Sequence, residues 1–170
     1  MTALVFVDTN VLVYARDAGE PGKQPRAITW LDHLWREALG RTSMQVLSEY
    51  YVTVTRKLAP GLPPEEAWDD VSALLAWNPQ PVDRDVLTGG HEIERRYRLS
   101  WWDSLVVAAA QVQGCAILLS EDLQDGASFA GVTVRNPFAF GVEQARASYD
   151  VGSTTRARRA GRGGRAVRPG

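Results

Sequence analysis

Three carboxylates in this sequence stand where a metal-dependent reaction could use them, and a fourth, Glu49, has a weaker case. Asp8 follows the apolar run 3–7, and Asp122 follows the apolar run 115–120. Both runs have the length and composition of buried strands. The carboxyl ends of parallel strands meet at the edge of a sheet where ligands bind. If these two strands are neighbours, Asp8 and Asp122 converge at that edge.

The other two carboxylates lie on predicted helices. Asp103 stands near the start of 100–113, which is apolar on nearly all sides and is therefore predicted to be a buried helix. A buried ionised carboxylate needs a partner or a metal. Ser100 and Asp103 also have the spacing of a capping box, so a structural role stays open. Glu49 lies off the apolar face of its helix, where a solvated charge is the simpler interpretation.

Each strand-end acid also has a purely structural alternative. Asp8 could cap the helix that follows it, as could Asn10, and Asp122 could begin a turn. Considered together, however, the two strand-end acids and Asp103 form an oxygen-rich set that a hard divalent cation would neutralise. Mg²⁺ and Mn²⁺ take such ligands. The chemistry that this set favours is phosphodiester hydrolysis.

The rest of the chain supplies the elements that would position these acids. Strands and helices alternate, which predicts an α/β fold with a parallel sheet between helical layers. We predict helices over 11–16, 26–39, 45–58, 64–77, 84–98 and 100–113, and strands over 3–7, 115–120 and 132–135, with further short strands within 41–45 and at Val82.

Charge is unevenly distributed along the 170 residues. The net charge is −1, yet the last 20 residues contain six arginines and no acid. Removing those six from the 19 basic residues leaves 13 against 20 acids, a net charge of −7 for residues 1–150. We therefore expect a folded domain over 1–145 and a disordered basic tail over 146–170.

Several function classes find no support in the composition. Cys115 is the single cysteine, which excludes an intrachain disulfide and a cysteine-based zinc cluster, and it is predicted to be buried. His33 and His91 are predicted to lie on exposed helix surfaces, which leaves Ser–His catalysis unsupported. No signal peptide or membrane-length apolar run is recognisable, so the expected compartment is the cytoplasm.

Four motifs, in this order and on this α/β pattern, resemble the PIN-domain ribonucleases, and more narrowly the VapC-type toxins of toxin–antitoxin pairs. The motifs are VDTNVLVYA, SEYYVT, WWDSLVVAAA and LLSEDLQDG, and the later segment VTVRNPF also fits. The resemblance covers about residues 3–140. It implies a three-layer α/β/α sandwich with a central, mainly parallel sheet.

The resemblance also implies an activity and a set of site residues. The family hydrolyses RNA phosphodiester bonds through a metal-activated water, with Mg²⁺ or Mn²⁺ held by acids. The implied metal ligands are Asp8, Asp103 and Asp122, and Glu49 would complete the catalytic set. Asn10 and Ser120 would orient the carboxylates. Whether Glu121 or Asp125 joins or replaces Asp122 stays open.

The implied partners are an RNA substrate, a small antitoxin that covers the acidic pocket, and a second copy of the chain in a homodimer. Arg95, Arg96 and Arg98 offer a basic cluster for RNA phosphates, and the basic tail offers another. Trp101 and Trp102 could stack on bases, although tryptophans at the start of a buried helix are more often part of the core.

Two other classes of protein remain as alternatives. One is a PIN fold that binds RNA or protein without cutting. The other is an aspartate phosphotransferase with Asp8 as nucleophile. That second class uses a lysine late in the chain, whereas the only lysines here are Lys23 and Lys57.

Overall fold

The computed structural model describes residues 3–147, which contain a five-stranded sheet. The strands are β1 (Val5–Val7), β2 (Gly40–Arg41), β3 (Ile117–Leu119), β4 (Ser128–Phe129) and β5 (Val132–Arg135), in the spatial order β2-β1-β3-β5-β4. All neighbouring pairs are parallel except β4 and β5. Val7 pairs with Leu119, so the chain leaves β1 and β3 side by side at the same edge.

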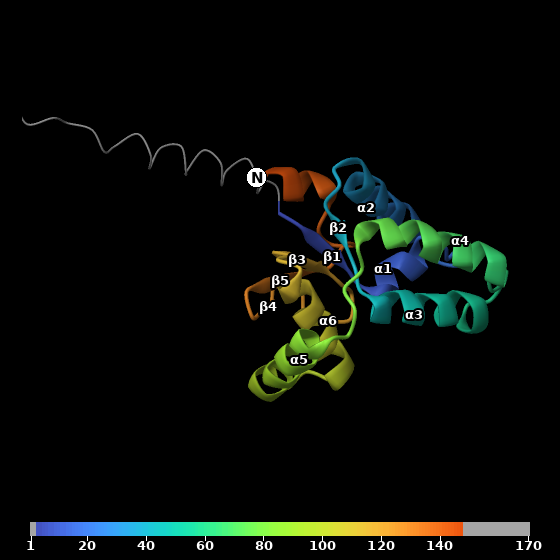
Figure 1. Cartoon of the computed structure of the whole chain (residues 1–170). Helices are drawn as coiled ribbons and strands as arrows, with labels where there is room; N and C mark the ends of the chain where they lie inside the picture. Colours follow the sequence, from blue (N-terminus) through green and yellow to red (C-terminus); the bar gives the residue numbers. More distant parts are fainter. Residues whose placement is uncertain (1–2, 148–170) are drawn as a thin grey trace, which may run out of the picture.

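Helices cover the sheet on both sides, which gives the predicted three-layer α/β/α sandwich with a mainly parallel sheet (Figure 1). Figure 1 shows α5 and α6 together on one side and α1 to α4 grouped on the other. Their bounds are α1 (Thr9–Tyr14), α2 (Gln24–Arg36), α3 (Met44–Val52), α4 (Pro64–Leu74), α5 (Arg84–Tyr97) and α6 (Trp101–Val112).

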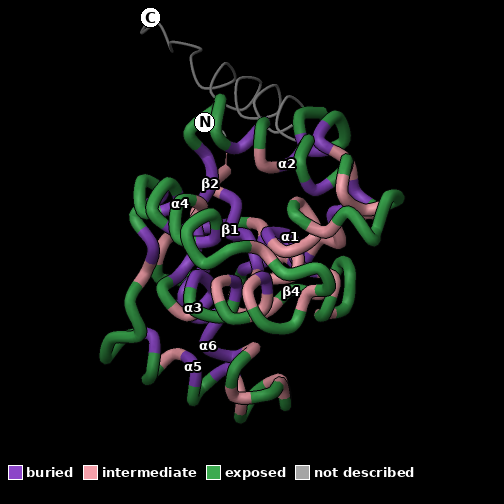
Figure 2. The backbone as a smooth tube through the Cα atoms, turned by 90° about the vertical axis from the view of Figure 1, so that its right-hand side faces the viewer, coloured by how far each residue is buried: buried purple, intermediate pink, exposed green. Residues whose placement is uncertain are grey.

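The core follows the apolar pattern of the sequence. Residues of β1 and most residues of α6 are buried, whereas much of α4 and α5 is exposed (Figure 2), and Leu118 and Leu119 of β3 are buried as well. Helix α6 is apolar on nearly all sides because it lies between the sheet and α5. Gly90 lets these two helices approach closely, since a Cβ at that position would lie 2.8 Å from Leu105 Cδ2.

Three local features differ from the prediction. Val82 belongs to no strand and is 43% exposed. Strand β4 was not predicted, because it is two residues long and joins β5 through Ala130 and Gly131, both at positive φ as a tight hairpin requires. Helix α3 continues into a π-helical turn, η1 (Thr53–Lys57).

The described part of the chain ends beyond the sheet in a helical segment over 142–147. The basic tail predicted over 146–170 therefore lies, after residue 147, outside the described residues. Within 3–147, no helix is long and apolar enough to cross a membrane.

Candidate active site

The first strand delivers Asp8 to the carboxyl edge of the sheet. Asp8 adopts an extended conformation after β1 and caps α1, where its Oδ1 accepts a hydrogen bond of 2.8 Å from the backbone N–H of Thr9. Its side chain is buried, with 6% of the residue exposed. The capping role and the site role therefore coincide in one carboxylate.

Asn10 and Ser120 connect Asp8 with Asp122. The Ser120 hydroxyl donates to Asp8 Oδ2 at 2.7 Å. The Asn10 amide nitrogen lies 3.3 Å from Asp8 Oδ2 and 3.1 Å from Asp122 Oδ2, so it donates toward both carboxylates. The same Asn10 accepts from the backbone N–H of Glu121 at 3.2 Å. Asp8 and Asp122 thus converge, as the adjacency of β1 and β3 requires.

Glu49 approaches the same edge from helix α3. Its Oε2 accepts a hydrogen bond of 2.9 Å from the Thr9 hydroxyl, and its Oε1 accepts one of 3.0 Å from Gln45. Thr9 also donates its backbone N–H to Asp8, so this one residue connects Glu49 with Asp8. Glu49 is exposed, as the solvated-charge interpretation predicts, but its carboxylate has the partners Thr9 and Gln45 at the edge of the sheet.

Asp103 lies at the start of α6, and its side chain turns toward its own cap. Asp103 Oδ2 accepts from the Ser100 hydroxyl at 2.7 Å, and the Asp103 N–H donates back to that oxygen at 3.1 Å. The capping interaction predicted as a structural alternative is therefore present. Gln45 also donates to the backbone oxygen of Trp102 at 3.4 Å, which places the start of α6 beside the helix of Glu49.

Two other acids near Asp122 have partners elsewhere. Glu121 is bonded to Lys23, and although its burial raises its pKa, the hydrogen bonds from Lys23 and Tyr14 outweigh this and lower it. Asp125 accepts from the backbone N–H of Asn136 at 2.9 Å. Within 120–125, Asp122 is the acid whose side chain joins Asp8.

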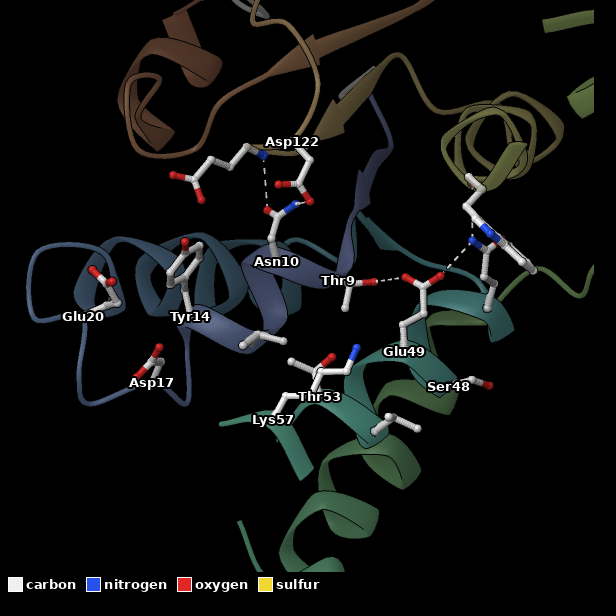
Figure 3. A pocket seen from close by; sticks show the side chains of 15 residues that line it. Thr9, Asn10, Tyr14, Asp17, Glu20, Ser48, Glu49, Thr53, Lys57 and Asp122 are labelled. Carbon is white, nitrogen blue, oxygen red and sulfur yellow. Dashed lines mark hydrogen bonds between the residues drawn. The ribbon is translucent and has the colours of Figure 1, made fainter. Parts of the chain in front are cut away.

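An open cleft of about 880 Å³ runs along these groups. Figure 3 shows Asn10 and Asp122 on one wall, and Thr9 and Glu49 joined across the middle. Asp8 lies beneath the surface, where Asn10 contacts it. A volume of this size is within the range of ligand-binding clefts in proteins.

Comparison with known proteins identifies this arrangement. A family model for the PIN domain matches residues 5–125. This chain belongs to the PIN-domain family. That result confirms the family inferred from the four sequence motifs. No curated protein matches the chain.

Two solved structures share the PIN fold of this chain. One is a toxin–antitoxin complex from Klebsiella pneumoniae, with a TM-score of 0.58 and 19% identity over 81% of this chain and 99% of that chain. The other is VapC20 of Mycobacterium tuberculosis, a sarcin-ricin loop cleaving toxin, with a TM-score of 0.52 and 21% identity over 76% of this chain and 98% of that one. At such identities the likeness establishes the fold.

The carboxylates of this PIN domain repel one another. Burial raises the pKa of Asp8 to about 6, the hydrogen bonds from Ser120 and Thr9 oppose this, and the charges of Asp122 and Glu49 add to the increase. Among the described residues, no lysine or arginine is bonded to any of these three acids. The three carboxylates are therefore not neutralised by an ion pair.

The donor set of the PIN domain fits a hard divalent cation. Asp8, Asp122 and Glu49 offer only oxygen atoms, which Mg²⁺ and Mn²⁺ prefer. Within residues 3–147, no three side chains of His, Cys, Asp or Glu already lie close enough together to coordinate one ion. Mg²⁺ retains several waters in protein sites, so one or two carboxylates suffice to hold it.

Other predictions about side chains have mixed outcomes. Cys115 is buried as predicted, and burial raises the pKa of its thiol to about 12. His33 is 4% exposed, so its predicted surface position is wrong; Trp30 beside it also belongs to the core. Trp102 is 63% exposed, which contradicts the core interpretation of that residue.

Sequence reasoning missed several residues that line the cleft of the PIN domain, among them Thr9, Gln45 and Lys57. Thr9 stands between two residues that were singled out, so its position was an available signal. Gln45 lies near the start of α3, and Lys57 lies in the turn η1 that continues α3. Their position beside the cleft depends on the packing of α3 against α1, which the sequence does not show.

Proposed function

We propose that this protein is a divalent-metal-dependent ribonuclease that acts as the toxin of a toxin–antitoxin pair. The observation that carries the proposal is the hydrogen bonding of one Asn10 amide to Asp8 and Asp122, with Glu49 joined through Thr9, at the edge of an open cleft. Membership of the PIN family and the oxygen-only donor set support it.

Each side chain has a definite role in this proposal. Asp8 and Asp122 hold the cation, with Asp103 as a third ligand once its side chain leaves Ser100. Asn10 and Ser120 fix the orientation of the two strand-end carboxylates, and Glu49 completes the acidic set. When bound, Mg²⁺ or Mn²⁺ supplies charge stabilisation of phosphoryl oxygens and lowers the pKa of water.

The structural neighbours support the proposed biological setting. One neighbour is part of a toxin–antitoxin complex, and the other is a toxin that cleaves the sarcin-ricin loop. On the basis of these neighbours, we propose that the substrate is RNA and that a small antitoxin inhibits the protein by covering the cleft. We also propose that two copies of the chain form a homodimer in the cytoplasm.

The test of the ribonuclease is cleavage of a total RNA pool by purified protein with Mg²⁺, with Mn²⁺ and with EDTA. Discrete cuts that require a divalent metal and disappear in Asp8→Asn are expected. Asp69→Asn, an exposed acid on α4, is the matched control and should cut like the wild type. Metal-independent cutting, or full activity of Asp8→Asn, would contradict the proposal. A folded protein that binds RNA and never cuts it would favour the non-cleaving alternative.

The toxin role has a separate test in cells. Induced expression of the wild type should stop growth, and expression of Asp8→Asn at the same level should not. Continued growth with active, RNA-cleaving protein present would sink the toxin role while leaving the nuclease intact.

A further inference from the structure

Trp102 is an exposed aromatic side chain at the rim of the cleft. It lies in the first turn of α6, is 63% exposed, and lines the cleft together with Gln45 and Glu49. Within residues 3–147 its ring stacks on no other aromatic ring. Its neighbour Trp101 instead packs against the core. An indole left uncovered beside an open cleft is a surface for a flat, apolar ligand group.

Lys57 lies at the other end of the cleft wall that α3 and η1 form. Figure 3 shows it beside Thr53, with its ammonium turned toward the space below Thr9. In the described part of the chain, the Lys57 ammonium makes no hydrogen bond or ion pair, whereas the Lys23 ammonium is held by Glu121. It is therefore an uncommitted positive charge in a cleft whose other charged groups are mostly acids.

The π-helical turn explains how Lys57 reaches the cleft. Glu49, Thr53 and Lys57 are four residues apart, and in a regular α-helix each such step rotates the side chain by about 40° away from the first. The turn η1 closes with a bond of 2.9 Å from the Leu58 N–H to the Thr53 oxygen, five residues apart. A wider turn rotates less per residue, which offsets the drift and keeps Lys57 on the Glu49 side. Such π turns are frequent at functional sites.

The wall therefore presents, in order, an aromatic ring, a carboxylate and a free ammonium. From Gln45 to Lys57 the helix rises on the order of 18 Å, which spans more than one nucleotide. Aromatic rings bind unpaired bases by stacking, and a lysine contacts a phosphate as a point charge. A duplex cannot offer an unpaired base to Trp102.

We propose that Trp102 and Lys57 form a two-point clamp for single-stranded RNA along α3, with a base stacked on Trp102 and a backbone phosphate on Lys57. The clamp rests on the proposed function, because RNA is the ligand. It holds the strand across Glu49 and so presents a phosphodiester to the acids. Neither clamp residue belongs to the acidic set that performs the chemistry.

The test measures binding separately from cleavage. Full-length Asp8→Asn protein in EDTA is titrated into a labelled, unstructured RNA oligonucleotide of mixed sequence, and fluorescence anisotropy is recorded over a range of KCl concentrations. Lys57→Gln and Trp102→Ala are added to this background. Arg56→Gln, an exposed neighbour outside the cleft, and Trp68→Ala, a tryptophan 57% exposed on α4, are the matched controls.

The two clamp residues should give different signatures. Lys57→Gln should weaken binding about threefold to fivefold at physiological salt and reduce the slope of log K against log[salt] by about 0.7, because one phosphate contact is lost. Lys57→Arg should restore both. Trp102→Ala should weaken binding roughly tenfold with an unchanged salt slope, since stacking releases no counterions. With a duplex of the same sequence, the Trp102 effect should vanish.

The outcomes separate the clamp from the proposed function. If the wild type cuts RNA with a metal while both clamp variants bind like Arg56→Gln and Trp68→Ala, the clamp is wrong and the nuclease stands. If the clamp variants behave as expected but the wild type never cuts, the clamp belongs to an RNA-binding module. Absence of any RNA binding by the Asp8→Asn protein overturns the clamp, as does an equal effect of Trp102→Ala on single-stranded and duplex RNA.

Discussion

Asp8 is held ionised at a cost in folding free energy. Its pKa is raised from 3.8 to about 6, with burial as the largest cause. That difference corresponds to roughly 3 kcal/mol. A cost of this size at a strand end is difficult to explain by helix capping alone, because asparagine caps a helix equally well without a charge. A charged side chain at this position is consistent with the proposed role of Asp8 in holding a cation.

We predict that Asp8→Asn stabilises the metal-free protein. Because the folded pKa lies above the unfolded value, the penalty is absent below pH 4 and complete above about pH 6. At pH 7.5 in EDTA the variant should unfold with a free energy about 1–3 kcal/mol above that of the wild type, and the difference should shrink at pH 4. Urea denaturation measures both values. Asp69→Asn should change neither, and a destabilised Asp8→Asn protein would refute the buried-charge account.

Divalent metal should reverse this order of stability. Binding to the folded state alone adds about 2.7 kcal/mol when the metal is at one hundred times its Kd. Thermal unfolding of the wild type should therefore shift upward with Mg²⁺ or Mn²⁺, and that of Asp8→Asn should not. Glu121→Gln is the matched control, because Lys23 already holds that carboxylate, and it should keep the shift. Equal shifts in wild type and Asp8→Asn would place the metal elsewhere.

At the scale of single residues, the sequence predicts the positions of acids at strand ends better than those of acids on helices. Asp8 and Asp122 follow buried strands, and neighbouring parallel strands bring such residues together whatever the helices do. Glu49 is exposed, as its position off the apolar face of α3 predicts, but a helical wheel does not show which side chains contact it. The polar side of α3 faces α1, where Thr9 meets it, and that contact depends on tertiary packing.

At the scale of elements, β2 depends on a glycine. A Cβ at Gly40 would lie 2.5 Å from the ring of Trp77, which is itself 4% exposed and packs against Trp35. A rigid, buried ring cannot move away as a flexible side chain can. Gly40→Ala should therefore destabilise the protein by about 1–3 kcal/mol through overpacking.

The control for this substitution is Gly22→Ala. A Cβ at Gly22 would meet nothing within 4 Å, and this glycine is not at positive φ. Chemical denaturation should show a large loss for Gly40→Ala and almost none for Gly22→Ala. Similar losses in both would mean that β2 tolerates repacking around Trp77.

The elements themselves were largely predictable where periodicity is long. Helices α4, α5 and α6 match their predicted ranges closely, because each carries a clear apolar stripe or an apolar surface bounded by proline, a cap or glycine. Strand β4 and the π turn were not predictable. A two-residue strand has no period to detect, and a π turn leaves the same residues in the same order and changes only which carbonyl is bonded.

At the scale of the whole molecule, the order of the strands follows from a general rule. Parallel strands joined through helices place sequential strands near one another in a doubly covered sheet. The sequence predicts this architecture, but it does not predict that β1 lies between β2 and β3, which is the arrangement that aligns Asp8 with Ser120. Only the structure establishes that β1 and β3 are neighbours.

The uneven charge of the chain leads to the last prediction. Residues 1–150 carry a net charge of −7, and the six arginines that follow them lie outside the described residues. A polyanion should be repelled by the first part and attracted by the second. Replacing all six arginines with glutamine in the full-length chain should weaken RNA binding and reduce the salt slope by up to about four, because each arginine–phosphate contact contributes about 0.7.

Replacing the six arginines should leave the stability and the cleavage rate of the folded domain unchanged. Thermal unfolding of the six-glutamine variant should match that of the wild type, and cleavage at saturating RNA should keep its rate while KM rises. This pattern separates a tether from a structural element, since loss of a packed segment would lower both stability and rate. An unchanged salt slope would show that the arginines do not contact RNA, and binding of the substrate would then depend on groups within the acidic domain, such as the proposed metal, Lys57 and Trp102.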